Sequence, residues 1–391
     1  MAQLMHATAL SVRERDRRYK VLREGLRERR VDCAVATGSN LFYLSNGISG
    51  ERFGLFPVED LPLTVVVNGR HLVDVQASVI VESQDWVEDV RGANDASALI
   101  ERIQELKLEK GSIGLASSNM PLNIHRQLSK ALPEAKLVDV SDLFTDVRTI
   151  KSDEEIALLE QASRVFDAGI ARLYERTRPG MTGKEAVQEA VQGMWAAGGD
   201  LDSTLSFNFG VVPKQNPVLA DLCLSRTLQW GEIGTLTGHS EYAHYAGHSD
   251  QEISFGEPSA VHREMFEAVL QVRDSVLAHV KPGATQRELV EIYREACQKT
   301  GFRWSVHSQM HQYGIDVPEF PGPAFRVADS SGAGLGSAGN YALAAGMIYS
   351  ISPTLVAPNG EDTLLGGTSL VVTADGYRNL SDRKVEMLVV T

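Results

Sequence analysis

The sequence predicts a two-domain chain of the α+β class, with an α/β domain over residues 1–148 and a second domain over residues 149–391. Three observations support this organisation. A chain of 391 residues is too long for one small hydrophobic core. Strand-like and helix-like segments alternate up to residue 148, which is typical of an α/β sandwich. Beyond that point the helices come in pairs, with β-rich stretches between and after them.

The first domain is predicted to open with an amphipathic helix over residues 12–31. Its spacing places Tyr19, Leu22 and Leu26 on one stripe, and we interpret the arginine-rich opposite face as solvated rather than as a binding patch. A buried strand, VDCAVATG, and a loop, SNLFYLSNG, follow. A hairpin is expected in LTVVVNGRHLVDV, with its turn at Asn68-Gly69. The helices SALIERIQELKLEKG and MPLNIHRQLSKALP then alternate with the strands SIGLASS and AKLVDVSDLF.

The second domain is predicted to hold two helix pairs outside a curved antiparallel sheet. Ser152 is a favourable N-cap for the first, long helix, and Thr182 opens the second. The third and fourth helices are expected in PSAVHREMFEAVLQVRDSVLAHVKPG and TQRELVEIYREACQKTG. A Pro-Gly step recurs at residues 179–180 and 282–283, which indicates an internal duplication. Strands are expected in LSFNFGVV, in a hairpin over residues 231–256, in GMIYSISP and in TSLVVTADG.

Composition excludes several classes of partner. The net charge of −13 argues against nucleic acid and anionic membrane, because both require a basic face. The three cysteines (Cys33, Cys223 and Cys297) form no CxxC pair, so we expect inert buried thiols in a reducing compartment. The N-terminus shows no apolar core of signal-peptide length, and no stretch is apolar enough to span a bilayer. We therefore expect a cytoplasmic protein.

The hairpin GEIGTLTGHSEYAHYAGHSDQEISFG is the most polar of the predicted β segments. It contains three histidines, His239, His244 and His248, and its carboxylates include Glu241 and Asp250. Unpaired ionisable groups in a dry interior cost several kcal/mol each, so one face of the hairpin is expected to line a wet cavity. The alternative is an exposed hairpin whose charges are solvated.

Several motifs in order then identify a family resemblance. The segments IKSDEEIALLEQA, RPGMT, KPGAT, HSQMHQYGIDVPE, AAGMIYSISP and VVTADGYRNLS follow one another along the second domain. Together they resemble the creatinase / aminopeptidase P / prolidase family, and VDCAVATGSNLFYLSNG is similar to the start of that family's first domain. The resemblance covers nearly the whole chain. It implies a C-terminal pita-bread domain preceded by a creatinase N-terminal-type α/β domain, and a homodimer.

The resemblance also implies five metal-binding positions, of which this chain keeps one. Peptidases of the family bind two divalent ions through two Asp, one His and two Glu, since hard ions need several oxygen ligands. The matching positions here are Thr237, His248, His311, Ser352 and Gly367. A two-residue slip would place Asp250 at the second Asp position, without restoring either Glu. We therefore expect no metal and no other cofactor. A single metal on His239, His248 and His311 is the alternative.

Creatinase provides a metal-free precedent in the same fold, from which this chain also departs. The resemblance implies that creatinase hydrolyses a C–N bond with a histidine in an HNP-like segment and with two glutamates. The matching positions here are Gln215, Asp250 and Ser352, so creatine is not inferred as the substrate. The second histidine of the peptidase motif is Pro318 here, which disfavours a proline peptidase.

The predicted site combines histidines with one carboxylate. His248 and Asp250 alternate along a strand and therefore share a face, which suits an acid–base pair. His307 and His311, four residues apart, are expected to bring two imidazoles to the same place. The predicted catalytic residues are thus His248, Asp250, His307 and His311, and the predicted substrate-binding residues are Gln215, Thr237, His239, Trp304 and Ser352. Trp304 is alternatively a core aromatic, and Ser352 alternatively a nucleophile.

These residues favour a metal-independent hydrolase of the creatinase-like type, which cleaves a C–N bond of amide or amidine character in a small polar substrate. A metal-free lyase that abstracts a proton is an alternative, because a His/Asp pair serves elimination equally well. A catalytically inactive binding module and an Xaa-Pro metallopeptidase with a rebuilt metal site are two more. The new histidine at a former Asp position argues against simple decay of the site.

Overall fold

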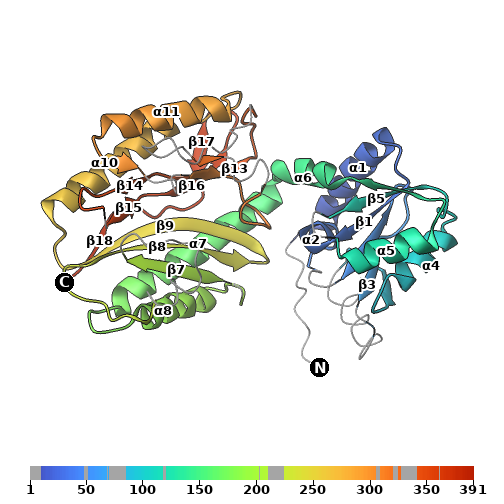
Figure 1. Cartoon of the computed structure of the whole chain (residues 1–391), viewed down its shortest axis with the longest axis horizontal. Coiled ribbons are helices and arrows are strands. Elements are labelled where there is room, and N and C mark those ends of the chain that lie inside the picture. Colours follow the sequence, from blue (N-terminus) through green and yellow to red (C-terminus); the bar gives the residue numbers. More distant parts are fainter. Residues whose placement is uncertain are drawn as a thin grey trace. The chain divides into compact units, whose positions relative to one another are not determined.

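The computed structural model describes residues 10–47, 52–67, 69, 85–117, 120–201, 203–209, 224–304, 309–319, 325–326, 341–360 and 362–391. The chain divides into two compact units, Met1–Arg148 and Thr149–Thr391 (Figure 1). Separate clusters of buried apolar side chains lie in the first unit and in the second. Each unit is therefore described by itself.

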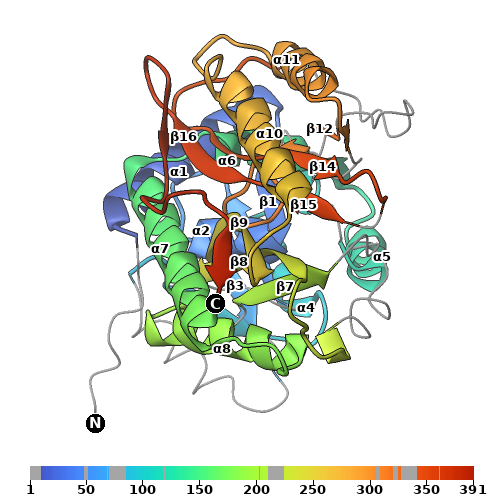
Figure 2. The ribbon, with the colours of Figure 1, turned by 90° about the vertical axis from the view of Figure 1, so that its left-hand side faces the viewer.

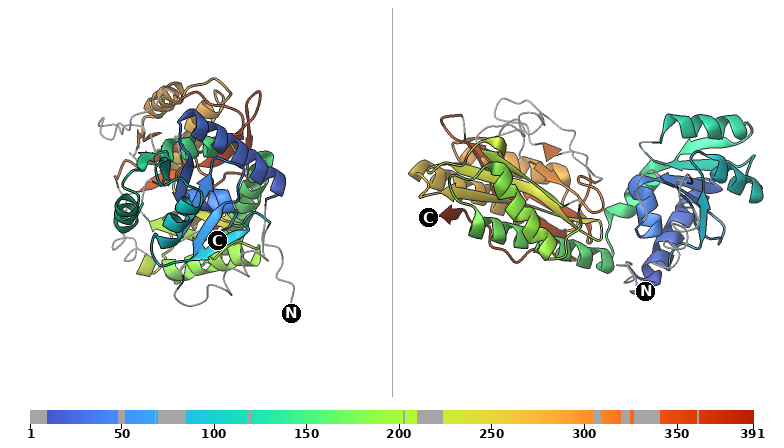
Figure 3. Two further views of the ribbon diagram at one scale, coloured as in Figure 1. Left: turned by 90° about the vertical axis from the view of Figure 1, so that its right-hand side faces the viewer. Right: turned by 90° about the horizontal axis from the view of Figure 1, so that it is seen from below.

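The first unit is built on a six-stranded sheet with the strand order β4-β3-β2-β1-β5-β6. The strands are β1 (Cys33–Thr37), β2 (Phe53–Pro57), β3 (Thr64–Val67), β4 (Asp89–Gly92), β5 (Ser112–Ala116) and β6 (Lys136–Asp139). The helices are α1 (Val12–Glu28), α2 (Gly38–Ser45), α4 (Ser97–Glu105), α5 (Leu122–Ala131) and α6 (Ser141–Thr149). Helices α4 and α5 pack their apolar stripes on the sheet (Figure 3, left).

Most predicted elements of this unit are confirmed, and two predictions are wrong. The segment expected as a loop after β1 forms helix α2, because Leu41, Phe42 and Leu44 are buried by tertiary packing. The last predicted strand ends at Asp139, and helix α6 follows it at once. The turn expected at Asn68-Gly69 lies largely outside the described residues.

The prediction that the arginine-rich face of α1 is solvated is wrong for Arg18. The Arg18 side chain is fully buried. Its guanidinium donates to the Glu14 carboxylate at 2.8 Å and to the Tyr43 carbonyl at 2.8 Å, and it lies 3.9 Å from the centre of the Tyr43 ring. The ion pair and the aromatic ring offset the cost of removing this charge from water.

The second unit contains four helices and three sheets among its described residues. The helices are α7 (Asp153–Arg176), α8 (Gly183–Ala196), α10 (Ala260–Leu277) and α11 (Gln286–Lys299). A four-stranded sheet, β18-β9-β8-β7, joins β7 (Thr204–Phe209), β8 (Ile233–Tyr242), β9 (Tyr245–Phe255) and β18 (Leu388–Val390). Helix α7 runs along this hairpin sheet (Figure 3, right). No described helix is long and apolar enough to cross a membrane.

The other two sheets lie under the second helix pair (Figure 2). The five-stranded sheet has the order β12-β11-β13-β16-β17, with β12 (Phe325–Arg326), β11 (Gln309–His311), β13 (Ile348–Ser352), β16 (Thr368–Val372) and β17 (Tyr377–Asn379). The three-stranded sheet has the order β10-β14-β15, with β10 (Arg303–Trp304), β14 (Thr354–Val356) and β15 (Thr363–Leu365). The two predicted helix pairs outside β structure are thus observed, whereas the described strands form three sheets in place of one antiparallel sheet, and β18 pairs with β9 in parallel.

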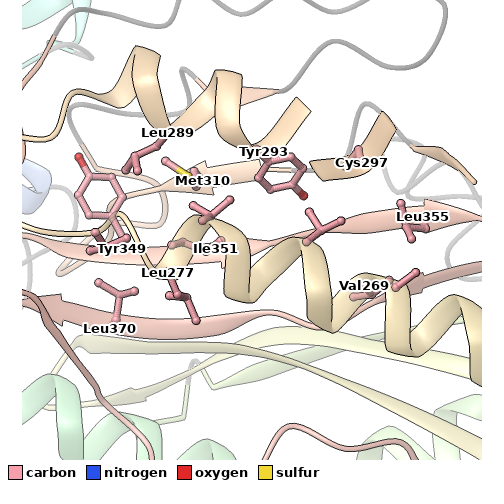
Figure 4. Close-up of a cluster of buried hydrophobic side chains, with 14 of the residues drawn as sticks. Val269, Leu277, Leu289, Tyr293, Cys297, Met310, Tyr349, Ile351, Leu355 and Leu370 are labelled. Atoms are coloured by element: carbon pink, nitrogen blue, oxygen red, sulfur yellow. The ribbon is translucent and has the colours of Figure 1, made fainter. Parts of the chain in front are cut away.

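The core beneath α10 and α11 determines which strand residues remain for a site. Val269 and Leu277 of α10 pack with Met310 of β11 and Ile351 of β13 (Figure 4). Because side chains alternate along a strand, the neighbours of these residues on β11 and β13 point to the opposite face. Those neighbours are polar: His311, Ser350 and Ser352.

Matching contacts support the predicted internal duplication. Helices α8 and α11 each begin with a capping box formed by a threonine and the glutamate three residues later. The glycine of each Pro-Gly step has a positive φ and donates its N–H to a leucine carbonyl at 2.9 Å. The equivalent residues are Gly180, Thr182, Glu185 and Leu228 in the first half, and Gly283, Thr285, Glu288 and Leu343 in the second.

The two described cysteines are free and buried, as predicted. Cys33 lies on β1 and Cys297 on α11. Burial raises the pKa of each thiol to about 12, so neither carries the thiolate that nucleophilic chemistry requires. Cys223 lies outside the described residues.

Candidate active site

A row of polar cross-strand pairs runs along one face of the β8–β9 hairpin. Residues paired directly across two antiparallel strands point to the same face. The register places His239 opposite His248, Thr237 opposite Asp250, and Thr235 opposite Glu252. His248 and Asp250 therefore share a face, as predicted, and the hairpin brings six polar side chains to it.

The His248 imidazole is held in one tautomer. Its Nδ1 lies 2.7 Å from the carbonyl oxygen of Gly238, so Nδ1 carries the hydrogen that is donated to this acceptor. The Nε2 atom is buried and has no hydrogen-bond partner among the described residues. His248 thus leaves its Nε2 open toward the site, where a neutral imidazole of this tautomer would accept a proton.

The His311 imidazole lies beside it at the end of β11. The centres of the two rings are 5.1 Å apart. Nδ1 of His311 lies 3.1 Å from the Gln312 carbonyl, which again leaves Nε2 as an acceptor. Burial, with a smaller contribution from His248, lowers the pKa of His311 to about 4, so this imidazole is neutral at pH 7. Burial and His248 also lower the pKa of His239.

Tyr313 forms an aromatic wall against both imidazoles. Its ring meets those of His248 and His311 edge-on, with ring centres 6.0 and 6.4 Å apart. The side chain is fully buried, and burial raises the pKa of its hydroxyl. The contact restricts the orientation of both rings, which an acid–base site requires.

The Asp250 carboxylate occupies space that the rest of the site leaves open. Ser352 Oγ donates to Asp250 Oδ2 at 2.6 Å. A Cβ atom at Gly367 would lie 2.0 Å from the same carboxylate oxygen and 2.6 Å from Ser352 Oγ. The carboxylate of β9 therefore fills the volume into which a side chain at residue 367 would extend.

A buried ion pair fixes the loop that follows His311. The Lys151 ammonium lies 2.7 Å from the Glu319 carboxylate, and both side chains are at most 5% exposed. The same carboxylate accepts the backbone N–H of Ile315 at 3.0 Å and that of Asp316 at 3.3 Å. The loop that contains Tyr313 is thereby attached to Lys151, the residue before the N-cap of α7.

The predicted site residues fall into three groups. The structure brings together His248, Asp250, His311 and Ser352, with Thr237 and His239 on the adjoining hairpin face. Trp304 packs against the hydrophobic core, which corresponds to its alternative interpretation. His307 and Gln215 lie outside the described residues.

Sequence reasoning missed Tyr313 and Glu252. The Glu252 side chain is buried, and its Oε1 accepts the Thr235 hydroxyl at 2.7 Å and the Leu365 backbone N–H at 2.8 Å. Continuing the strand alternation from His248 through Asp250 would have found Glu252. Nothing in the spacing singles out Tyr313, because it follows the end of a strand.

Comparison with known proteins identifies the family. The model of metallopeptidase family M24 matches residues 157–378, and the creatinase/prolidase N-terminal domain matches residues 18–150. The chain belongs to metallopeptidase family M24. The predicted family and the predicted fold, a creatinase N-terminal-type domain followed by a pita-bread domain, are confirmed.

Relatives within this family are hydrolases. The chain is 27% identical to a creatinase from a Bacillus species over 399 residues, covering 95% of this chain and 91% of that protein. It is 22% identical to an Xaa-Pro dipeptidase from Pyrococcus horikoshii over 311 residues, covering 78% and 81% of the two chains.

Solved structures of the M24 fold superpose over nearly the whole chain. An X-Pro aminopeptidase from Thermotoga maritima gives a TM-score of 0.79 at 19% identity, covering 95% of this chain and 99% of that one. An Xaa-Pro dipeptidase from Bacillus anthracis gives 0.80 at 19% identity, covering 96% and 100%. At this identity the likeness establishes the fold alone.

The donor set does not fit the pair of divalent ions expected from the M24 resemblance. Ser352 and Thr237 offer neutral hydroxyls, Gly367 offers no ligand, and the space beside it is filled by Asp250. Within the described part of the chain, the one group of three potential ligands whose donor atoms lie within 4.8 Å of one another is Asp200, Glu241 and His244, at the hairpin turn. Two divalent cations need more oxygen ligands than the site residues supply.

Proposed function

We propose that this M24 protein is a metal-independent hydrolase that cleaves a C–N bond of amide or amidine character in a small polar substrate. The proposal rests mainly on the hydrogen bonding and burial of the His248 imidazole. Its Nδ1–H donates to the Gly238 carbonyl, and its buried Nε2 has no hydrogen-bond partner among the described residues and lies on the face that carries Asp250, next to the His311 ring. This arrangement supplies a general base without a metal.

In the proposed reaction, His248 moves one proton twice. Its Nε2 takes a proton from water as the water oxygen bonds to the substrate carbon. The resulting imidazolium then gives that proton to the nitrogen of the breaking C–N bond, which leaves as a neutral amine. His311, with a pKa near 4, stays neutral at pH 7 and accepts a hydrogen bond at its Nε2. This allows it to orient the water or an N–H of the substrate.

Asp250 is assigned the role of a charged hydrogen-bond acceptor. Its Oδ2 is oriented by Ser352, and its position on the same face as His248 lets it stabilise the imidazolium or bind a substrate N–H. Thr237 and His239 complete the wall on the neighbouring strand. The assignment of Ser352 as an orienting hydroxyl replaces its alternative as a nucleophile.

A metallopeptidase with a rebuilt site is the second candidate, and one observation favours it. Both imidazoles donate Nδ1–H to backbone carbonyls, which is also how metal-binding histidines are usually held. Against it, the two carboxylates on this face of the hairpin already accept hydrogen bonds within the protein, Asp250 from Ser352 and Glu252 from Thr235 and Leu365. A lyase would use the same base at His248, with abstraction of a proton from carbon in place of water.

The test is turnover by metal-stripped protein and by His248→Gln. A panel of small amides and amidines, including creatine and Xaa-Pro dipeptides, would be screened for release of amine, ammonia or urea. Chelator-treated protein is expected to retain activity, and His248→Gln to lose about 100-fold or more in kcat. The exposed His279→Gln variant serves as the control and is expected to match the parent.

Three outcomes would overturn the proposal. Unchanged turnover in His248→Gln would remove His248 from the chemistry. Loss of activity on chelation, restored by added metal, would favour the metallopeptidase. An unsaturated product in place of a hydrolysed one would identify the lyase.

We also propose that the protein is a cytoplasmic homodimer. The family resemblance supports the dimer, and the buried free thiols of Cys33 and Cys297 fit a reducing compartment. Light scattering on the purified 42.7 kDa chain tests the assembly, and a monomeric mass would contradict it.

A further inference from the structure

Among the residues that the structure describes, no strand lies along the outer edge of the strand segment that carries His248 and Asp250. On its inner edge β9 pairs with β8 from Tyr245 to Ser254. On the outer edge β18 pairs only with Ile253, Ser254 and Phe255. Among the described residues, no strand therefore pairs with this edge at His248–Gln251, although these residues hold the proposed working groups.

Side chains take the place of the missing strand. The Ser369 hydroxyl donates to the His248 carbonyl, and the Arg383 guanidinium donates to the Asp250 carbonyl at 3.2 Å. Gln251 Nε2 in turn donates to the Glu386 carbonyl at 2.7 Å. The backbone carbonyls that a ladder would have satisfied thus have partners, as buried carbonyls require.

Arg383 makes more of these contacts than any other described side chain of the C-terminal segment, residues 381–386. Its Nη2 donates to Ser249 Oγ at 3.1 Å, and its Nη1 donates to Gln251 Oε1. Its Nε donates at 2.8 Å to Asp167 of α7, and the Arg383 and Asp167 side chains are 17% and 22% exposed. One guanidinium therefore joins α7, the C-terminal segment and the three residues centred on Asp250.

We propose that Arg383 is a positioning residue for the active site, which holds β9 so that His248 and Asp250 keep their places. The identification of these two as working groups rests on the proposed function. Ser249 and Gln251 point to the face of β9 opposite the site. Arg383 forms hydrogen bonds with both side chains on that face and does not contact the side chains of His248 or Asp250.

The geometry requires an arginine. A planar guanidinium offers five donors in a fixed arrangement, whereas an ammonium is a point charge on a flexible chain. Four acceptors on two elements are met here by one side chain. Lysine at this position would keep the charge beside Asp167 and lose most of the contacts to β9.

The test compares Arg383→Gln with Arg378→Gln in the full-length protein. Arg378 is a matched control, because it also pairs with an α7 carboxylate, Glu160, but forms no hydrogen bond with β9 in the described part of the chain. Two readouts need no substrate: amide exchange over residues 248–252 by mass spectrometry, and the imidazole signal of His248 in ¹⁵N-histidine-labelled protein. His248→Gln assigns that signal.

Arg383→Gln is expected to speed exchange over this segment about tenfold and to shift or broaden the Nδ1–H signal of His248. Arg378→Gln should leave both as in the parent, and Arg383→Lys should fall between. The proposal would be overturned if Arg383→Gln lowered the melting temperature but left both the amide exchange of residues 248–252 and the His248 signal unchanged. Arg383 would then stabilise the fold without positioning the site. Should Arg383→Gln fail to fold, Arg383→Lys decides by the same criteria. Because neither readout uses turnover, failure of the hydrolase proposal would be seen separately.

Discussion

Among individual residues, the position of the Asp250 carboxylate is the most distinctive feature of this site. Asp250 lies on β9, bonded to Ser352, and its oxygen fills the space beside Gly367. The family resemblance implies that a metallopeptidase carries glutamates at the positions of residues 352 and 367. Here a single carboxylate from the neighbouring strand occupies that volume, so Gly367 is required for Asp250 to stay where it is.

Gly367→Ala should destabilise the protein. Its Cβ would lie 2.0 Å from Asp250 Oδ2, so the carboxylate must move and Ser352 must lose its acceptor. We expect a loss of about 1–3 kcal/mol in the free energy of unfolding, measured with urea. Gly376→Ala is the control, since its Cβ would meet only a backbone oxygen at 4.0 Å. Equal stability of the two variants would contradict the described packing.

His311 should make the fold sensitive to mild acid. The unfolded chain binds a proton at this imidazole below the ordinary pKa of 6.5, whereas burial lowers the folded pKa to about 4. The free energy of unfolding therefore decreases as the pH falls from 6.5 to 4, because the unfolded chain binds a proton at this imidazole that the folded protein does not. When the pH is lowered from 7 to 5, the free energy of unfolding of His311→Gln should fall by about 2 kcal/mol less than that of the parent protein. Parallel losses would show that the imidazole titrates normally.

Among the secondary-structure elements, the loop after β11 depends on a remote anchor. Its carboxylate, Glu319, bonds to the Lys151 ammonium and to two backbone N–H groups within the loop. Tyr313 in this loop contacts both imidazoles. Lys151, the residue before the N-cap of α7, thus helps to place the wall of the site, and Arg383 holds β9.

Lys151→Met should be strongly destabilising, because it leaves the Glu319 charge buried without its partner. Removing one member of a buried ion pair costs about 3–5 kcal/mol. The double variant Lys151→Met/Glu319→Gln should recover part of that loss, since no charge is then stranded. Urea unfolding of the two single variants and the double variant measures the coupling. Additive losses would mean that the pair does not interact.

For the molecule as a whole, the site lies where the two halves of the second unit meet. The first half supplies the β8–β9 hairpin, and the second supplies β11, β13 and β16. Helices α8 and α11 of the two halves begin with the same threonine–glutamate capping box. Such a junction brings polar strand faces together while each helix pair keeps its own apolar core.

Strong local signals allowed most of the fold to be predicted. Ser152 and Thr182 cap the helices where the sequence indicated, and the hairpin forms in the expected place. Helix α2 was missed because its burial depends on tertiary packing that no local pattern reveals. Arg18 was missed for a related reason: the aromatic ring beneath it, Tyr43, is distant in sequence.

The candidate site was predictable in part. Strand alternation brought His248 and Asp250 to one face, and motif order added His311 and Ser352. The roles of Tyr313 and Arg383 depend on contacts between segments far apart in the chain, which one sequence does not encode in any short-range pattern. The tautomer of His248 likewise depends on the carbonyl of Gly238 across the hairpin.

The most direct test of the central claim is the metal content of active protein, determined by mass spectrometry before and after dialysis against chelator. Independence from metal predicts well below one equivalent of zinc, manganese, iron or cobalt per chain, with turnover unchanged by dialysis. One or more tightly held equivalents, whose removal abolishes turnover and whose return restores it, would contradict the account. His248 and His311 would then be metal ligands, and the proton transfers assigned here to His248 would have to be abandoned.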